Sequence, residues 1–213
     1  MSTHRNYHDF RECLEWSAIQ SDEPFWDQVY RKAFPDMIGW INTASAGKSP
    51  IQEHGIDRII VLKSDRYLYV DEKKSRRSYD SFFLEYISND SLRPHAAGWM
   101  EKPLRIDFLA YAFMPDQRVY LLQWDMLQRA WRNLRREWLS TYPTRKVPNK
   151  TYHTWGVCVP ISVVRAAISR AGIIDVQLDA LAVADEPPQP TIFQRPLPPT
   201  SREQGSLFDD CVA

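Results

Sequence analysis

The sequence predicts an α/β or α+β domain whose helices precede, interrupt and follow a mostly contiguous sheet. Helix-periodic and β-rich segments alternate along residues 1–185, and hydrophobic residues make up 44% of the 213-residue chain, which is enough to bury a core. Six of the 15 prolines lie between Pro187 and Pro199, where neither a helix nor a central strand can persist. We therefore expect one α/β domain over residues 1–185 and an extended or disordered tail over residues 186–213.

The first half of the domain is expected to hold two helices and a hairpin. Apolar residues spaced through residues 7–20 predict a helix, and residues 23–34 predict a second. The β-rich runs at 56–62 and 67–72 flank a short polar turn, which predicts a β-hairpin.

The second half is expected to continue with strands and two further helices. Asp125 can cap a strongly helical run that follows it, and Ser162 can open a last helix that reaches about residue 171. The expected segments are strands at 81–88, 105–113, 118–124 and 155–161, and a helix over 126–139.

The composition excludes several classes of protein. No apolar run approaches the roughly 20 residues that span a bilayer, and the polar first residues do not form a signal peptide. Three scattered cysteines are too few for a disulfide framework or a cysteine zinc site. We therefore expect a cytoplasmic protein with no membrane partner.

The formal net charge is zero, but positive charge is concentrated in residues 126–150. Arg129, Arg132 and Arg136 are spaced to share one face of the predicted helix, opposite its apolar face. Lys146 and Lys150 follow in the next loop. Arginine binds phosphate bidentately, so these five residues are candidate DNA contacts, although a solvated helix face explains the charge pattern equally well.

The candidate catalytic residues lie on the predicted hairpin. Asp57 begins its first strand, Asp71 and Lys73 end its second, and Glu85 lies on the next strand. Two carboxylates can hold Mg²⁺ or Mn²⁺, and a neighbouring lysine can stabilise negative charge that develops on a phosphate. This combination predicts metal-assisted hydrolysis of phosphodiester bonds.

The register of the hairpin leaves an alternative open. Side chains alternate along a strand, so an odd turn length places Asp57 with Asp71 and Lys73, whereas an even one places it with Glu72 and Lys74. An acid-x-Lys triplet is expected about once by chance in a chain of this composition, so ordinary surface charges at a hairpin end remain the alternative interpretation.

Several short segments resemble the PD-(D/E)XK nuclease superfamily, and in particular phage and prophage nuclease-like proteins. They are GID (55–57), YVDEKK (69–74), FFLEYIS (82–88) and GWMEKPLRIDFLAYAF (98–113). The resemblance implies a restriction-endonuclease-like core, in which a central mixed sheet is flanked by helices. The literal Pro-Asp pair of the superfamily is absent, because Ile56 precedes Asp57.

The resemblance also implies roles for individual residues. Asp57 would be the first metal ligand, Asp71 the second and Lys73 the catalytic lysine. Glu85 would be an accessory ligand or a supporting polar residue, and Glu12 or Glu15 would match an acid on the first helix. The implied function is a Mg²⁺- or Mn²⁺-dependent deoxyribonuclease. The alternatives are a catalytically inactive nuclease fold that binds DNA or a protein, and a small adaptor.

The tail carries a second short motif. Residues 204–208, QGSLF, resemble the peptide that binds the bacterial sliding clamp. Leu207 and Phe208 can fill an apolar cleft, and Gln204 can form hydrogen bonds beside it. We therefore expect the sliding clamp as a partner.

Overall fold

The computed structural model describes residues 23–43 and 54–179. The helix predicted over residues 7–20, with Glu12 and Glu15, and the predicted tail, with its QGSLF motif, lie outside the described residues. The α-helices in the described ranges are α2 (Glu23–Ala33), α4 (Trp124–Thr141) and α5 (Ile161–Ile168). The strands there are β1 (Met37–Asn42), β2 (Arg58–Leu62), β3 (Tyr67–Ser75), β4 (Ser81–Asn89), β5 (Ala96–Ala97), β6 (Phe108–Phe113), β7 (Arg118–Gln123), β8 (Thr144–Pro148), β9 (His153–Pro160) and β10 (Ile173–Gln177).

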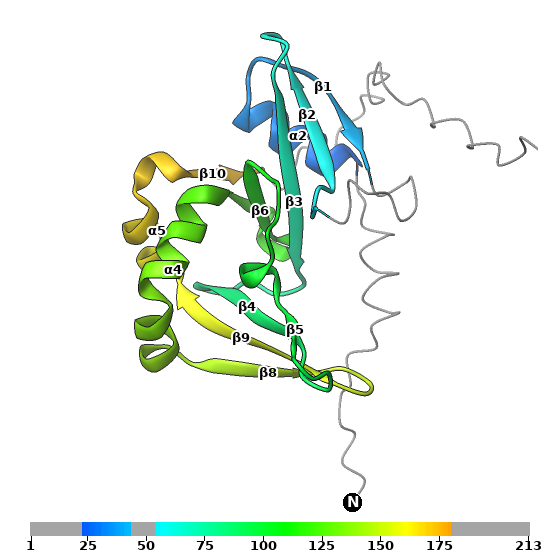
Figure 1. The fold of residues 1–213 in the computed structure, drawn as a ribbon. Helices are drawn as coiled ribbons and strands as arrows, with labels where there is room; N and C mark the ends of the chain where they lie inside the picture. The colour runs from blue at the N-terminus through cyan, green and yellow to red at the C-terminus, as the bar shows by residue number, and fades with distance from the viewer. Residues whose placement is uncertain (1–22, 44–53, 180–213) are drawn as a thin grey trace, which may run out of the picture.

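The strands form two sheets (Figure 1). The larger has the order β1-β2-β3-β6-β7-β10 and is mixed, because β3 and β6 are parallel and all its other pairs are antiparallel. The smaller is antiparallel, in the order β5-β4-β9-β8. The predicted α/β class with a central mixed sheet is confirmed. The expectation of one contiguous sheet is wrong, because β4 does not pair with β3 but with β9 in the smaller sheet.

Helix α2 covers one face of the six-stranded sheet. Trp26, Val29 and Tyr30 follow the helical spacing of three and four residues, so all three point toward the sheet and are fully buried. They pack against side chains from β2 and β3, among which Ile60 and Val70 are also fully buried.

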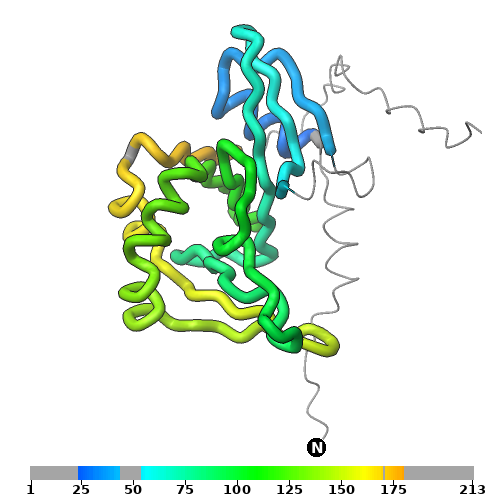
Figure 2. Tube along the Cα trace, viewed as in Figure 1, coloured from blue at the N-terminus to red at the C-terminus, as the bar shows by residue number. Residues whose placement is uncertain are grey.

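The opposite face packs on the four-stranded sheet, α4 and α5. Leu109, Tyr111 and Phe113 alternate along β6 and enter this second core. The apolar face of α4 contributes the buried side chains of Leu127 and Trp131, as its periodicity predicts. The β2–β3 hairpin projects beyond the four-stranded sheet (Figure 2).

Most predicted elements are present, with corrections at the helix starts. The predicted hairpin is confirmed by the antiparallel pairing of β2 and β3. Asp125 is not the cap of α4, because Gln123 holds that position and the Asp125 carboxylate accepts a hydrogen bond from the nitrogen of Met126 within the first turn. Helix α5 begins directly after Pro160, whose ring fits a helix start, rather than at Ser162.

None of the helices in the described ranges has the length and apolar composition needed to cross a bilayer.

Candidate active site at the β2–β3 hairpin

The hairpin register brings Asp57 to the face of β3 that carries Asp71 and Lys73. Arg58 lies opposite Val70, and Ile59 lies opposite Tyr69. The backbone nitrogen of Asp57 continues this ladder with a 2.9 Å hydrogen bond to the carbonyl of Val70. Five residues close the turn between the paired Val61 and Tyr67, an odd number, so the side chain of Asp57 shares a face with that of Asp71.

The three side chains form a tight polar cluster. The Lys73 ammonium donates a hydrogen bond to Asp71 Oδ1 at 2.7 Å and lies 2.7 Å from Oδ2 as well. Asp57 Oδ2 accepts a 2.8 Å hydrogen bond from the backbone nitrogen of Glu72. Asp71 is only 3% exposed, whereas the Lys73 side chain is 32% exposed. The cluster therefore lies at the edge of the core, with its lysine reaching solvent.

The electrostatics of the cluster favour a shared proton or a cation. Burial, and then the neighbouring Asp71 charge, raise the pKa of Asp57 from 3.8 to about 6, although Lys73 and the Glu72 N–H oppose the shift. Burial on its own lowers the pKa of Lys73, but the charges of Asp71 and Asp57 outweigh it and raise that pKa above its ordinary value. Lys73 is therefore protonated at neutral pH, and added positive charge would help both carboxylates to ionise.

Glu85 approaches the cluster from β4 of the other sheet. Burial raises the pKa of Glu85 above its ordinary value, and the positive charges of Lys73 and Lys102 oppose the shift. Glu85 and Asp71 therefore both interact electrostatically with Lys73. The backbone of Gly98 lies against Glu85, and a Cβ at Gly98 would stand 2.5 Å from the carbonyl oxygen of Glu85. Only glycine permits that approach without displacement, which ties Glu85 to the segment before β6.

Glu72 and Lys74 lie on the opposite face of β3, under α2. Glu72 forms a buried ion pair with Arg58, 2.6 Å between Oε1 and Nε, and accepts a 2.8 Å hydrogen bond from the Tyr30 hydroxyl. The Lys74 ammonium lies 5.9 Å from the centre of the Trp26 ring. These two residues belong to the helix-facing core and do not join Asp57.

Asp57 and Asp71 fit a magnesium site in which the protein supplies only two ligands. Mg²⁺ is commonly held by one or two carboxylates, with waters and substrate phosphates completing its octahedron. Asp71 is only 3% exposed, and both of its carboxylate oxygens lie 2.7 Å from the Lys73 ammonium, so a metal ion bound at Asp71 would share that carboxylate with Lys73. Within the described residues no group of three or more His, Cys, Asp and Glu side chains is arranged to hold a metal, so the fit is to a two-carboxylate site.

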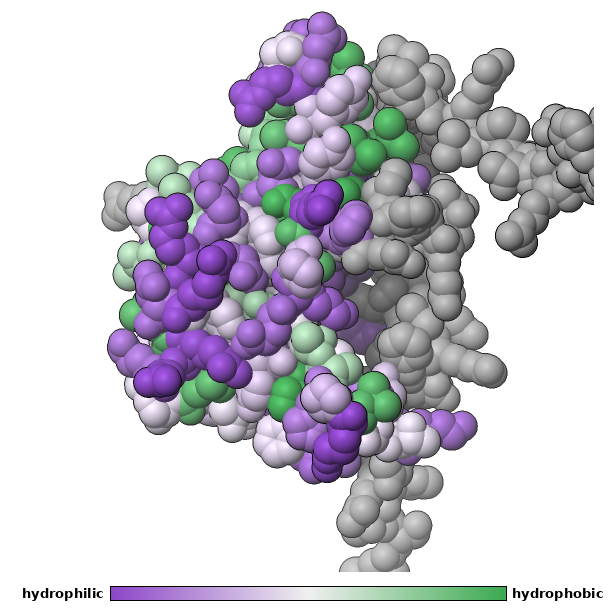
Figure 3. Space-filling view, viewed as in Figure 1, coloured by the Kyte–Doolittle hydropathy of each residue, from purple (hydrophilic) through white to green (hydrophobic). Residues whose placement is uncertain are grey.

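The candidate DNA-binding arginines lie together on the solvent face of α4. Arg129, Arg132 and Arg136 are all exposed, while Trp131 and Trp138 of the same helix are buried. Figure 3 shows hydrophilic side chains gathered over the α4 side of the molecule. The predicted periodicity is therefore confirmed for the position of these residues on the solvent face of the helix.

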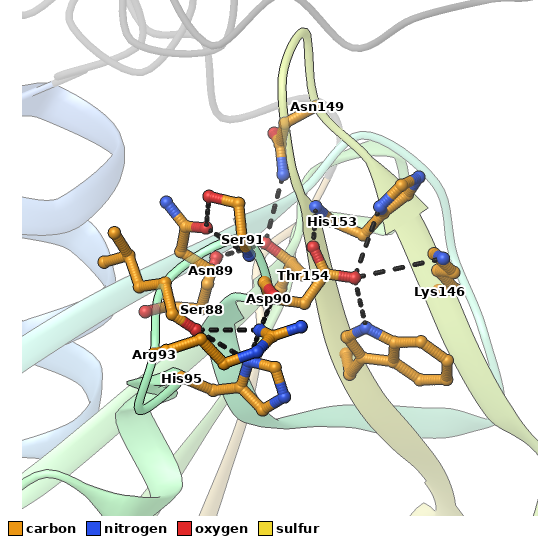
Figure 4. Close-up of polar contacts among 12 residues, drawn as sticks. Ser88, Asn89, Asp90, Ser91, Arg93, His95, Lys146, Asn149, His153 and Thr154 are labelled. Atoms are coloured by element: carbon orange, nitrogen blue, oxygen red, sulfur yellow. Dashed lines mark hydrogen bonds and ion pairs between the residues drawn. The ribbon is translucent and has the colours of Figure 1, made fainter.

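Lys146 and Lys150 belong to the β8–β9 hairpin, which is attached to β4 by a polar network around Asp90 (Figure 4). The Asp90 carboxylate accepts hydrogen bonds from the backbone nitrogen of His153 at 2.8 Å and from the Trp155 indole N–H at 3.0 Å. Its Oδ2 lies 3.9 Å from the Lys146 ammonium. These hydrogen bonds lower the pKa of Asp90 to about 2. No local motif indicates this network, because Lys146, His153 and Trp155 are all more than 50 residues from Asp90 in the sequence.

Comparisons with protein-family models, with curated proteins and with solved structures find no match. Function must therefore be inferred from the site itself.

Proposed function

We propose that the protein is a metal-dependent deoxyribonuclease that hydrolyses DNA phosphodiester bonds. The observation that carries the proposal is the meeting of Asp57, Asp71 and Lys73 on one face at the edge of the core. Two close carboxylates can hold a metal ion, and a charged lysine beside them can stabilise developing negative charge, so the cluster supplies groups that metal-assisted phosphodiester hydrolysis uses.

The residues of the cluster have distinct roles in this proposal. Asp57 and Asp71 would hold Mg²⁺ or Mn²⁺, which when bound polarises the phosphate and lowers the pKa of a water. Because the pKa of Lys73 is raised, its side chain acts as a fixed positive charge that stabilises the developing negative charge on the phosphate. Glu85 is an accessory group that balances the positive charge of Lys73 and Lys102.

The cationic face of α4 supports DNA as the substrate. Arg129, Arg132 and Arg136 are exposed, and within the described residues none of these three side chains forms an ion pair with a carboxylate. Lys146 and Lys150 add two exposed cations on the β8–β9 hairpin. Such surfaces bind the phosphate backbone without regard to sequence.

A cleavage assay with Mg²⁺, Mn²⁺ or EDTA tests the proposal on linear, circular, single-stranded and branched DNA. We expect metal-dependent cleavage by the parent protein and its loss in Asp71→Ala and Lys73→Ala. Asp36→Ala is the matched control, because Asp36 is exposed and lies between α2 and β1. Cleavage that survives both site substitutions would identify a contaminant and reject the proposal.

A second candidate function is a catalytically inactive nuclease fold that binds DNA or a protein. It is favoured by the Lys73 ammonium, which lies 2.7 Å from both oxygens of Asp71 and so competes with a metal for that carboxylate. DNA binding by a folded parent protein that never cleaves would select this candidate.

We also propose that the QGSLF motif recruits the protein to the bacterial sliding clamp. The motif lies outside the described residues, and its sequence carries the proposal: Leu207 and Phe208 are apolar anchors beside the hydrogen-bonding Gln204. A peptide of residues 200–213 should bind a bacterial clamp, and replacing Gln204, Leu207 and Phe208 by alanine should abolish binding. Equal binding by both peptides would reject this partner.

A further inference from the structure

Two exposed tyrosines lie in line with the candidate catalytic residues on β3. Tyr67 is 54% exposed and Tyr69 is 37% exposed, which places both among the large hydrophobic side chains most open to solvent. Because side chains alternate along a strand, Tyr67 and Tyr69 share their face with Asp71 and Lys73. One row of side chains therefore runs from an aromatic half to a charged half.

The aromatic half of the row is exposed, whereas the charged half lies beside the core. Asp71 and Lys73 pair with Leu109 and Tyr111 of β6, which pack into the core beneath the four-stranded sheet. The pairing of β6 with β3 begins only at Val70, so the tyrosines precede it. They lie on the projecting hairpin seen in Figure 1 and Figure 2.

The surroundings of the tyrosines suit an anionic, aromatic ligand. Lys63 and Arg66, in the turn that leads into β3, are exposed cations at the far end of the row, and Figure 3 shows hydrophilic side chains at the tip of the hairpin. The nearby acids are Asp65, which is exposed in the same turn, and Asp107, whose Oδ2 accepts a 2.8 Å hydrogen bond from the backbone nitrogen of Tyr69. That bond turns the Asp107 carboxylate toward the strand backbone and fixes the position of Tyr69.

We infer that Tyr67 and Tyr69 form a stacking platform for unpaired bases, which leads single-stranded DNA to Asp71 and Lys73. Aromatic side chains on an open sheet face bind single strands because every exposed base offers a π-face, whereas the bases of a duplex are already stacked on each other. Side chains two residues apart on a strand are about 7 Å apart, which allows successive bases to stack. The inference rests on the proposed nuclease function and narrows its substrate to DNA with an unpaired strand.

Binding measured without metal tests the platform separately from cleavage. Fluorescence anisotropy in EDTA would compare a thymidine oligonucleotide of about 15 nucleotides with a duplex of equal length. We expect Tyr67→Ala/Tyr69→Ala to weaken single-strand binding about tenfold or more and to leave duplex binding within about twofold. Tyr67→Phe/Tyr69→Phe should bind as the parent does, because stacking needs the ring and not the hydroxyl. Tyr79→Ala is the matched control, since Tyr79 is 41% exposed and lies outside β3, with its ring centre 5.6 Å from the Arg145 guanidinium of β8.

Several results would overturn the inference. The first is equal single-strand binding by the parent and the double alanine variant when both proteins are folded. The second is a loss of single-strand affinity in the phenylalanine variant or in Tyr79→Ala as large as that in the double alanine variant. The third is tighter binding of a uridine oligonucleotide than of the thymidine one. If the parent cleaves DNA but the double alanine variant binds and cleaves single strands normally, the platform is wrong and the nuclease stands. If the parent binds single strands through the tyrosines but never cleaves, the nuclease is wrong and the platform stands as a binding site.

Discussion

Asp57 Oδ2 accepts a 2.8 Å hydrogen bond from the backbone nitrogen of Glu72, across the β2–β3 hairpin. The bond holds the Asp57 carboxylate against the strand that carries Asp71 on one face and Glu72 on the other. It thereby keeps two acids close enough for the charge of Asp71 to raise the pKa of Asp57. Proximity of this kind costs stability and is typical of sites that bind a cation or a proton.

We predict that Asp57→Asn stabilises the protein at pH 8. The folded-state pKa is raised from 3.8 to about 6, so the parent gains stability as the pH falls through about 6 and Asp57 takes up a proton. The asparagine variant avoids the ionised form, and its advantage at pH 8 is at most about 3 kcal/mol and shrinks below pH 6. Urea unfolding at pH 8 and pH 5, with Asp36→Asn as the control, measures the difference. A variant less stable than the parent at pH 8 would contradict the account.

Glu72→Ala should destabilise the protein by about 3–5 kcal/mol, because it leaves Arg58 charged and buried. Tyr30→Phe, which removes only the hydroxyl bonded to Glu72, should cost about 1 kcal/mol. Chemical denaturation measures both free energies of unfolding. A Glu72→Ala variant as stable as the parent would show that the helix-facing assignment of Glu72 is wrong.

The Asp90 network should respond to acid. The pKa of Asp90 is lowered to about 2, so its contribution to stability is complete above the ordinary value of 3.8 and is lost as the pH falls from there toward 2. Asp90→Asn should therefore lower the melting temperature at pH 6, and the difference from the parent should diminish as the pH approaches 3. Faster exchange of the Trp155 indole proton in the variant would locate the effect at the β8–β9 hairpin. A melting difference that is independent of pH would argue against the charge of Asp90 as its cause.

Charge reversal on α4 should weaken DNA binding. Arg132→Glu/Arg136→Glu removes two candidate phosphate contacts, so the slope of log affinity against log salt should become shallower by about 2. Arg31→Glu/Lys32→Glu makes the same change of charge on α2, which covers the other face of the larger sheet. Unchanged binding in a folded Arg132→Glu/Arg136→Glu variant, or an equal loss in the α2 control, would remove α4 from the DNA-binding surface.

The apolar periodicities predicted α2, the hairpin, β4, β6, β7, α4 and β9, because each of these elements buries a regular face. Strand β8 was not predicted, since Arg145 and Lys146 are exposed on an edge strand that exists only through its pairing with β9. The division into two sheets depends on the same long-range pairing, which connects β4 to a strand about 70 residues later. Local sequence patterns carry no information on such partners.

Sequence reasoning reached the candidate site only in part. The identities of Asp57, Asp71 and Lys73 were available from the motif, but their common face required the turn length, which the pairing of β2 with β3 supplies. The proximity of Glu85 to Lys73 depends on the packing of one sheet against the other. The sequence places Tyr67 and Tyr69 in step with Asp71, but only the three-dimensional packing shows that their side chains are exposed.

The most direct test of the central claim is the rate of DNA cleavage by the parent, Asp71→Asn and Asp36→Asn at increasing Mg²⁺ or Mn²⁺, on single-stranded and duplex DNA. The asparagine at residue 71 preserves the shape of the side chain and removes its charge, so the comparison isolates the carboxylate. The account predicts metal-dependent cleavage by the parent and the Asp36 variant, and a rate lower by about 100-fold or more in the folded Asp71 variant. Absence of cleavage by the parent with either metal, or an unchanged rate in Asp71→Asn, would contradict it.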